Sequence, residues 1–586
     1  MKLISSISVI KYGLLAALLV FLMTQMSWKT ADGKYNSQII SGDGVGYYQY
    51  LVNYFYNETI ENQQKDTDFM MEYEGRVVNK CFAGAALCMA PFYKIAEFHS
   101  SVVNEAFDPY SPRTKKWINV GSLIYVLFSC FFIFKWLTLF NVNRSAIFWS
   151  IFSILFGSNL FLYAVLSPSM THVYSFFAVS GFLLFSAQFF QLQKAKSVFV
   201  ASFFLGLIVI IRPINGVVLL LLPFLANGFE TLRESMQSIK PFTWFKALLA
   251  GFLPVSVQLY LWYLQTGNWI VWSYGEEGFY WGNPQIIEVL FGFRKGWFVY
   301  TPIVVLAFFG LPFIYKKSKT QFISILLFFI VLVYVVSSWW NWYYGSSFGQ
   351  RSFVDFYAVI AMLLAILLER IKRKRLQYIL AIVFIFGLVG LNLFQSFQYK
   401  ENIISSWDMT ARKYAATFGV SKPNQVRIGG SREILPFNAQ KELIADTAFS
   451  FPSDYEYKVD GVTEYFNYSD KEYGVAFKSI LHECSNLSRG YYIELVLNRM
   501  ELELNSSENA KVVVELKNRV GEQIHYAWFL LNEVPAKDKL QWANYEYQVS
   551  LPKCNSDHNE LLIYIRNEDQ SKFLISKFEA KVFDIY

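Results

Sequence analysis

Long apolar runs recur along the first two thirds of the chain and then stop. Most are close to the roughly 20 residues that a helix needs to cross the hydrocarbon core of a bilayer. They are Tyr12–Met26, Ile118–Phe140, Ala146–Val165, Val173–Phe190, Val198–Leu225, Phe245–Leu264, Phe298–Tyr315, Phe322–Ser337, Phe353–Leu368 and Tyr378–Phe394. The pattern predicts an α-helical polytopic membrane bundle of about eleven transmembrane helices within residues 1–400. The first run lacks a clear cleavage site, so we expect it to stay as an uncleaved helix.

Basic clusters orient these runs, because short loops rich in Lys and Arg face the cytoplasm. The clusters lie at Lys194/Lys196, at Lys316–Lys319 and at Arg370–Arg375. All three can be cytoplasmic only if Val198–Leu225 is a re-entrant or short hairpin that turns at Arg212-Pro213, where Pro213 disfavours a continuous helix. The same count requires the short apolar stretch Phe82–Phe98 to lie along the membrane surface.

This topology places the N-terminus in the cytoplasm and five polar segments on the outer side. They are an outer loop with interfacial helices at residues 28–117, then Leu166–His172, the Arg212 turn, Thr266–Trp297 and Ser338–Ser352. Everything after Gln395 is also predicted to be extracytoplasmic.

From about residue 445 the period of the pattern changes to two. Short alternating runs rich in β-branched and aromatic residues are separated by Asn, Gly, Pro and Ser clusters, which is typical of antiparallel strands. The runs are Tyr491–Leu497, Lys511–Leu516, His525–Leu531, Tyr545–Leu551, Glu560–Ile565 and Phe578–Ile585. They predict a jelly-roll-like β-sandwich at residues 445–586, joined through a linker at residues 401–444 with some helix near Thr410–Thr417. This domain could stabilise the protein, or bind a sugar or partner.

Composition supports this division and excludes other classes. The 586 residues are 54% hydrophobic and 19% aromatic, with a mean hydropathy of +0.29. The formal charge of +7 sits in short loops, so it indicates topology rather than a nucleic-acid surface. Five cysteines without a CxxC pattern argue against zinc. Cys484 and Cys554 could pair if the sandwich is exported, or remain free thiols.

The first outer loop holds the most informative polar residue. Asp43 stands between Gly42 and Gly44, just beyond the first apolar run, and is followed by Tyr47-Tyr48. Glycines allow a tight backbone path, so a carboxylate here could reach the membrane surface. It could act as a general base or help to hold a divalent cation. The alternative is an Asx-type turn without chemistry.

His172 and Arg212 stand at other outer positions. His172 could donate to a phosphate or a sugar hydroxyl, or could cap the following helix. Arg212 lies between two apolar half-runs, where a cation is costly and therefore indicates function. Its planar guanidinium suits a phosphate. Snorkelling, or pairing with an acid on a neighbouring helix, is the alternative.

Two further outer loops carry charges among aromatic residues. Glu276 and Glu277, with Arg294 and Lys295, could face a charged ligand or pair with one another on a solvated surface. The last loop, Trp339–Arg351, could be an interfacial belt or a sugar-stacking wall. Arg351 and Asp355 stand at i and i+4, a spacing that predicts an ion pair on a helix.

Several of these motifs together give the chain a resemblance to a known family. It resembles the polytopic C-type glycosyltransferases that use polyprenyl-phosphate sugar donors, which include protein O-mannosyltransferases and lipid A aminoarabinose transferases. The likeness covers roughly the first two thirds of the chain. The matching residues are Gly42-Asp43-Gly44 with Tyr47-Tyr48, Asn79–Tyr93, His172–Phe176, Arg212-Pro213 and Tyr344–Arg351.

The resemblance implies a membrane glycosyltransferase that moves a hexosyl or pentosyl unit from polyprenyl phosphate to a glycan, lipid or protein acceptor at the outer face. In such enzymes an acid in the first outer loop is essential, and here that residue is Asp43. The substrate-binding candidates are Tyr47, His172, Arg212, Glu276, Arg294, Lys295 and Arg351. Asp108 and Glu276 are the candidates for a second acid beside Asp43. No cofactor is implied with certainty, and a divalent cation is an open option.

Two other classes remain as alternatives: a lipid-linked sugar transporter or flippase, and a non-catalytic envelope scaffold. A transporter predicts charged residues along a path through the whole membrane. In this sequence the ionisable residues gather on the predicted outer side, which favours the enzyme. No P-loop, GxGxxG, HExxH or GxSxG motif points to another class.

Overall fold

A computed structural model describes most of the chain. The described residues are 6–28, 39–61, 63, 69–275, 277–401, 403–406, 409–421, 441–448, 458–460, 463–469, 471–481, 490–503, 507, 510–517, 521, 523–531, 539–551, 559–568 and 570–585. The chain divides into two compact units, Met1–Phe397 and Gln398–Tyr586. Cys484 and Cys554, for which the sequence leaves both a disulfide and two free thiols open, lie outside the described residues.

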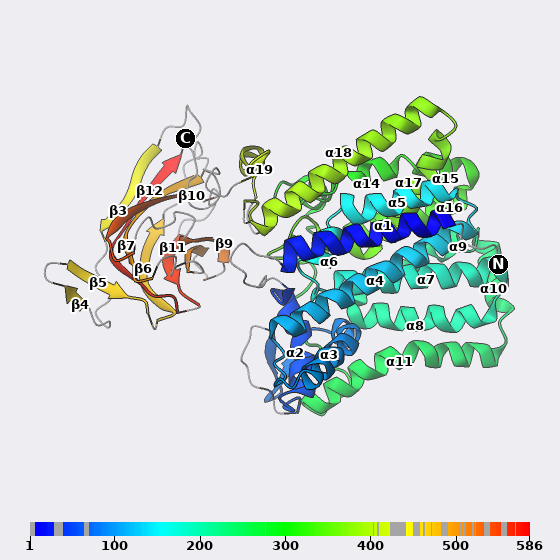
Figure 1. The fold of residues 1–586 in the computed structure, drawn as a ribbon, viewed down its shortest axis with the longest axis horizontal. Coiled ribbons are helices and arrows are strands. Elements are labelled where there is room, and N and C mark those ends of the chain that lie inside the picture. Colours follow the sequence, from blue (N-terminus) through cyan, green and yellow to red (C-terminus); the bar gives the residue numbers. More distant parts are fainter. Residues whose placement is uncertain are drawn as a thin grey trace. The chain divides into compact units, whose positions relative to one another are not determined.

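The first unit is almost entirely helical (Figure 1). Its first half contains α1 (Ser6–Met23), the π-helix η1 (Thr24–Trp28), α2 (Asp43–Phe55), a hairpin of β1 (Met70–Tyr73) and β2 (Arg76–Asn79), α3 (Gly84–Val102), α4 (Pro112–Leu139), α5 (Arg144–Gly157), α6 (Leu160–Val165), α7 (His172–Leu192) and α8 (Ala195–Ile211). Its second half contains the 3-10 helix η3 (Pro213–Leu221), α9 (Leu222–Leu225), α10 (Phe229–Gln237), α11 (Pro241–Thr266), α12 (Ile286–Phe291), α13 (Trp297–Tyr300), α14 (Ile303–Phe308), α15 (Leu311–Lys317), α16 (Lys319–Ser338), the 3-10 helix η4 (Arg351–Phe356), α17 (Tyr357–Ile371) and α18 (Arg375–Lys400).

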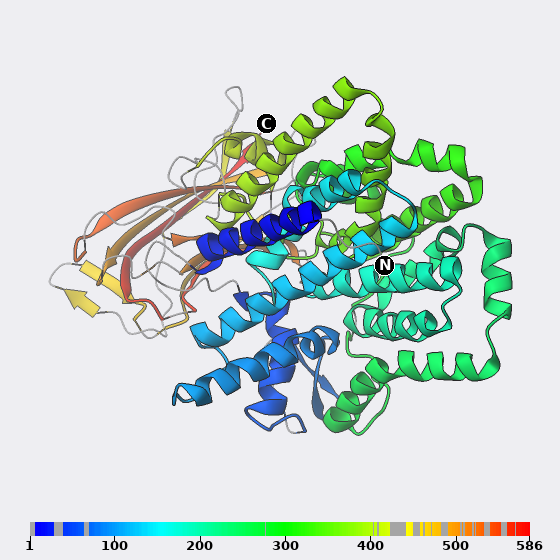
Figure 2. The same cartoon turned by 45° about the vertical axis from the view of Figure 1, so that its right-hand side comes forward.

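Seven helices of the described chain are long and apolar enough to cross a membrane, or eight if one bent pair counts as a single span. The spans are Ile10–Trp28, Pro112–Leu139, His172–Leu192, Pro241–Thr266, Lys319–Ser338, Arg351–Ile371 and Arg375–Lys400. The predicted polytopic helical bundle is therefore confirmed, while the count of about eleven stays a prediction. The predicted runs at residues 146–165 and 298–315 are each broken into shorter helices. Figures 1 and 2 show α2 running across the direction of the spanning helices.

The predicted break at Arg212-Pro213 is confirmed. α8 ends at Ile211, and Arg212 has an extended backbone before η3 begins at Pro213. Pro213 cannot donate the backbone hydrogen bond that would continue α8, so the chain turns here. Arg212 lies beside His172 at one end of the bundle, and Phe224 lies at the other end. The segment therefore runs to one end and returns, as predicted.

The predicted cytoplasmic clusters share one end of the bundle. Lys317, Arg370 and Arg373 line a common cavity there. The α7–α8 turn beside Lys194 is joined to α10 by a hydrogen bond from Gln193 to Ser235. The bundle thus has a basic end and an opposite end, although which of them faces the cytoplasm stays a prediction.

Polar residues define where several spans begin. The Ser111 side chain accepts a hydrogen bond from the Thr114 backbone N–H (3.3 Å), and Pro112 occupies the first turn of α4. Asn143 caps α5, and Ser318 caps α16 by accepting from the Gln321 N–H. These caps satisfy backbone donors that the first turn of a helix leaves free, and they fix the loops at the membrane boundary.

The second unit carries a short helix, α19 (Ala411–Thr417), and two antiparallel sheets. One sheet has the strand order β10-β7-β12-β5-β4, with β3 also on β12, and the other has the order β6-β11-β8-β9. The strands are β3 (Lys441–Ala448), β4 (Lys458–Asp460), β5 (Thr463–Asn467), β6 (Tyr473–Leu481), β7 (Gly490–Glu501), β8 (Lys511–Lys517), β9 (Gln523–Leu530), β10 (Ala543–Leu551), β11 (Asn559–Arg566) and β12 (Phe573–Ile585).

Alternating side chains from both sheets form one apolar core. Leu495 of β7 pairs in register with Ala580 of β12, and Ile563 of β11 pairs with Val514 of β8. All four side chains belong to the same buried cluster, so the two sheets pack as a sandwich. The six predicted runs correspond to β7–β12, while β3–β6 were not predicted. β3 begins at Lys441, inside the predicted linker.

Candidate active site

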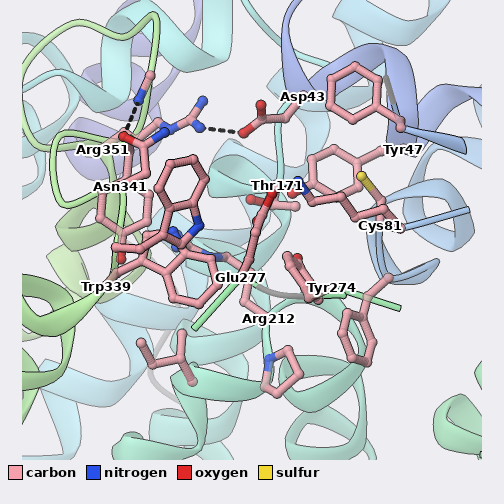
Figure 3. A pocket seen from close by; sticks show the side chains of 18 of the residues that line it. Asp43, Tyr47, Cys81, Thr171, Arg212, Tyr274, Glu277, Trp339, Asn341 and Arg351 are labelled. Carbon is pink, nitrogen blue, oxygen red and sulfur yellow. Dashed lines mark hydrogen bonds and ion pairs between the residues drawn. The ribbon is translucent and has the colours of Figure 1, made fainter. Parts of the chain in front are cut away.

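A cavity of about 440 Å³ lies at the end of the bundle opposite the basic clusters. All five segments that the sequence places on the outer side contribute side chains to it. The residues that matter for its chemistry are Asp43, Tyr47, Lys80, Cys81, His172, Arg212, Tyr274, Glu277, Trp339, Tyr344 and Arg351. Figure 3 shows Tyr47, Cys81 and Tyr274 on one side of the cavity and Trp339 and Asn341 on the other.

The backbone around Asp43 requires both neighbouring glycines. Gly42 has a φ of +54° just before α2, a conformation that L side chains rarely adopt. At Gly44, an added Cβ would lie 2.0 Å from the Ser169 Oγ. The two glycines thus let α2 begin against the loop before α7, and Asp43 occupies its first turn.

Asp43 forms an ion pair with Arg351 across the cavity (Figure 3). The Asp43 side chain is 41% exposed, whereas the Arg351 side chain is only 8% exposed. The carboxylate of Asp43 therefore remains open to the cavity. The guanidinium of Arg351 is largely buried but also belongs to the cavity lining. An arginine fork is suited to two oxygens at once, so it can bind a second anion beside Asp43.

The predicted ion pair between Arg351 and Asp355 is wrong. Residues Arg351–Phe356 form a 3-10 helix, in which positions i and i+3 share a face and positions i and i+4 do not. Arg351 consequently turns towards Asp43. Asp355 turns the other way and is completely buried.

Asp355 instead joins three other segments. Its Oδ1 lies 2.9 Å from the His172 Nδ1, and its Oδ2 accepts from the Arg212 Nη1 (3.2 Å) and from the Asn215 Nδ2 (2.7 Å). Arg212 also donates to the Ser352 Oγ (3.3 Å). A buried carboxylate needs such partners. The alternative that Arg212 pairs with an acid on a neighbouring helix is thus observed, and Arg212 still lines the cavity.

A second ion pair crosses the cavity wall between Lys80 and Glu277. Lys80 follows β2, and its ammonium also lies 5.7 Å from the centre of the Tyr274 ring. The acid predicted at this position was Glu276, which lies outside the described residues. Of the two adjacent acids in this part of the sequence, Glu277 is the one that the structure describes, and it lines the cavity.

The structure places Arg294 and Lys295 away from the cavity lining. Arg294 stacks on Tyr343, with its guanidinium carbon 3.4 Å from the ring centre. Lys295 is buried and donates to the Ser347 carbonyl. Both cations therefore contact the last outer loop. Asp108, one of the suggested partners of Asp43, accepts from the backbone N–H of Tyr110 in a separate turn.

Burial keeps the hydroxyl and thiol groups of the wall neutral. It raises the pKa of Tyr47, Tyr274 and Cys81 well above their usual values, and the nearby Asp43 carboxylate raises the pKa of each further. Neutral phenols can donate hydrogen bonds to the oxygens of a ligand. The aromatic residues thus form a wall with polar donors rather than a uniform apolar surface.

Within the described part of the chain, no group of three or more His, Cys, Asp or Glu side chains is arranged to hold a metal ion. The divalent cation considered from the sequence stays a prediction.

Sequence reasoning missed Asp355 as the partner of Arg212, and it missed Lys80. Asp355 was noticed only for its spacing from Arg351, and nothing in that spacing announces a 3-10 turn. Lys80 stands alone between a short strand and an apolar helix, so no pattern marks it. Both become visible only when segments far apart in the sequence meet.

Comparisons with known proteins give structural neighbours only. No protein-family model matches the chain, and no curated protein matches it. Among solved structures, the chain is similar to the arabinosyltransferase EmbB from Mycobacterium smegmatis, with a TM-score of 0.41, 11% identity, and coverage of 100% of this chain and 65% of that one.

It is also similar to the oligosaccharyltransferase AglB from Archaeoglobus fulgidus in complex with an inhibitory peptide and a dolichol-phosphate. That match has a TM-score of 0.38 and 11% identity, and it covers 68% of this chain and 56% of that one. The chain thus spans between about half and two thirds of the length of the structures it matches. By name, these two neighbours are an arabinosyltransferase and an oligosaccharyltransferase.

Proposed function

We propose that this protein is a membrane glycosyltransferase that moves a sugar from a polyprenyl-phosphate donor to an acceptor at the membrane surface. One observation carries the proposal: Asp43, Arg212 and Arg351 open onto one cavity at the end of a membrane bundle. A base and two fixed cations are the groups that such a transfer needs. The acceptor hydroxyl must lose a proton, and the phosphate leaving group must be stabilised.

The position of the cavity suits a donor dissolved in the bilayer. The spans that begin at His172 and Arg351 start at the cavity, so it lies near the boundary between hydrocarbon and water. A polyprenyl phosphate keeps its chain in the membrane and its charge at this boundary, because burying that charge in hydrocarbon is prohibitive. The phosphate would therefore arrive at the level of Arg212 and Arg351.

Asp355 supports the role of Arg212 by fixing its direction. It occupies the Nη1 edge of the guanidinium, and Ser352 contacts Nη2. The ring of Tyr344 lies 5.6 Å from the guanidinium carbon. A cation held in this way can stabilise charge on a leaving phosphate without reorganising during the reaction.

Arg351 connects the base to the phosphate. While it is paired with Asp43, the carboxylate is partly occupied. A donor phosphate beside Arg351 would compete for the guanidinium and leave more of the carboxylate free for the acceptor hydroxyl. Binding of the donor would thereby prepare the base.

The reaction then follows an inverting displacement. The acceptor oxygen forms a bond to the anomeric carbon, while the bond from that carbon to the phosphate oxygen breaks. The acceptor proton moves to a carboxylate oxygen of Asp43, and the bonding electron pair leaves with the phosphate. Trp339 and Tyr274 line the same cavity and offer flat faces on which a sugar ring could stack.

The transporter alternative is less well supported. Transport through the bundle requires polar groups along a continuous path. The cavity with Asp43 and the cavity at the basic end share no lining residue.

Release of polyprenyl phosphate by the purified full-length protein tests the proposal. A panel of polyprenyl-phosphate hexoses and pentoses, offered with envelope glycans, lipids and peptides as acceptors, should yield free polyprenyl phosphate with at least one pair. Movement of a labelled donor across proteoliposomes without such release would support transport and overturn the proposal.

A further inference from the structure

A second cavity, of about 530 Å³, lies at the basic end of the bundle. It forms where α4, α15 and α17 end and where α5 and α16 begin. Side chains from the α4–α5 turn, α9, α15, α16, α17 and the α17–α18 turn line it. Its lining includes Phe140, Phe224, Lys317, Arg370, Lys372 and Arg373.

The charges around this cavity are strongly one-sided. Lys317, Arg370, Lys372 and Arg373 line it against a single carboxylate, Glu369. All four cations are exposed. Within the described residues, none of them lies within ion-pair distance of a carboxylate, in contrast to the cations of the candidate active site. The cavity thus presents positive charge that the protein itself leaves uncompensated.

Aromatic and aliphatic side chains, among them Phe140, Phe224 and Ile314, form the more buried floor of the cavity. The rings of Phe140 and Phe224 stack with their centres 5.4 Å apart and their planes 4° from parallel. The buried Gln321 amide fixes this floor by donating to the carbonyl of Phe224 (3.0 Å) and to the Asn227 Oδ1 (2.9 Å). At the rim, Lys372 donates to the Asn143 Oδ1 (3.0 Å). An apolar floor below a cationic rim matches a molecule with one charged end.

We propose that this cavity binds the phosphate-bearing headgroup of an anionic membrane lipid. The cations would contact the phosphate, and the aromatic floor would contact the glycerol and the first methylene groups of the lipid. The cavity lies at span ends, which is the level of lipid headgroups. Basic pockets between spans on the cytoplasmic side are suited to anionic headgroups. Setting the topology requires Lys and Arg in loops, but it does not require a cavity with an apolar floor.

This site is separate from the proposed reaction, so it is tested without measuring activity. The purified full-length protein is titrated with dioleoyl phosphatidylglycerol or with dioleoyl phosphatidylcholine, and native mass spectrometry counts the retained lipids. The unmodified protein should retain phosphatidylglycerol preferentially. Millimolar inorganic phosphate should not displace it, because a free phosphate lacks the apolar contacts.

A matched pair of variants locates the binding. The double variant Lys317→Gln/Lys372→Gln removes two cations from the cavity. The control, Lys194→Gln/Lys196→Gln, removes two exposed lysines near the same end but outside the cavity lining. The first change should weaken phosphatidylglycerol binding about 100-fold, since each charge-assisted contact to the phosphate contributes about tenfold. The control should change it less than about threefold.

Three results would overturn the proposal. Equal losses in both variants would show general surface attraction, and equal retention of the two lipids would show that no anion is selected. Displacement by inorganic phosphate would assign the cavity to a soluble anion. Gel filtration and the thermal midpoint without added lipid check that both variants are folded, and the lipid preference of the unmodified protein provides a test independent of any substitution.

Discussion

The two ends of the membrane bundle use charged residues in opposite ways. At the Asp43 end, ion pairs join segments far apart in the sequence: Asp43 and Arg351 are separated by 308 positions, and Arg212 and Asp355 by 143. At the basic end, Lys317, Arg370 and Arg373 are exposed and lie outside any ion pair among the described residues. Charged residues near the ends of spans therefore have two distinct roles.

Burial explains the difference. A charge removed from water requires a partner, and an exposed lysine or arginine does not. The buried Asp355 has three donors around it, so the Asp43 end depends on the whole fold being correct. The exposed cations of the basic end need no partner from a distant segment, so their positions follow from the local sequence of each loop, as expected for topology signals. Their charge remains available to a ligand.

Replacing Asp43 should have the largest effect and tests the active end directly. Asp43→Asn keeps the size of the side chain but removes the proposed base. Turnover should fall by about 10²–10⁴-fold, which is the range for general base catalysis. The measurement is release of polyprenyl phosphate at saturating donor.

Asp108→Asn is the matched control, because Asp108 is an acid in the same outer segment but outside the cavity lining. Its turnover should stay within about threefold of the unmodified protein. Equal turnover in Asp43→Asn and the unmodified protein would remove Asp43 from the reaction.

Removing Asp355 should affect stability more than any change at the basic end. Asp355→Ala leaves Arg212 without its carboxylate partner and should cost about 3–5 kcal/mol of folding free energy. Glu369→Ala provides the comparison, since Glu369 lies on the same span, Arg351–Ile371, near its opposite end. That change should cost less than about 0.5 kcal/mol.

Unfolding by denaturant or heat in mild detergent measures the loss of folding free energy in each variant. Similar losses for Asp355→Ala and Glu369→Ala would contradict the distinction between the fully buried network around Asp355 and the more accessible charges of the basic end.

The close approach at Gly44 should have an intermediate effect. Gly44→Ala places a Cβ against Ser169 and should cost about 1–3 kcal/mol through overpacking, with a loss of transfer because α2 carries Asp43. Adding Ser169→Gly should restore part of the lost stability and part of the lost transfer activity. Gly387→Ala has open space around its added Cβ and is the control. If Gly44→Ala behaves like Gly387→Ala, the tight contact is not required.

The partly exposed pair of Lys80 and Glu277 should matter least. Their side chains are 21% and 26% exposed, so solvent screens the attraction between them. A double-mutant cycle with Lys80→Gln and Glu277→Gln should give a coupling energy below about 1 kcal/mol that shrinks with added salt. A coupling of about 3 kcal/mol, insensitive to salt, would place this pair with the buried network instead.

Repetition along the chain made the fold predictable. Apolar runs of the right length predict spans, and alternation predicts β7–β12, because both patterns are local. The short strands β4 and β5 carry too few alternating positions to be recognised. The break at Arg212 was predictable because Pro213 acts on its immediate neighbour.

The partners within the site were not predictable in the same way. Asp43, His172, Arg212 and Arg351 were identified as candidates because polar residues at outer positions stand out. The pairing of Arg351 was predicted incorrectly, because a spacing of four assumes an α-helix where the chain forms a 3-10 turn. Which side chains meet depends on contacts between distant segments, and no local pattern encodes them.

In the proposed reaction, the paired charges at the Asp43 end, rather than the exposed cations at the basic end, receive the phosphate of the donor. A cryo-electron microscopy map of the full-length protein with a bound polyprenyl phosphate would locate that phosphate. We expect phosphate density within hydrogen-bond distance, about 3 Å, of the guanidinium groups of Arg212 and Arg351. Density for the polyprenyl phosphate beside Lys317 and Arg373, with none in the Asp43 cavity, would contradict this expectation.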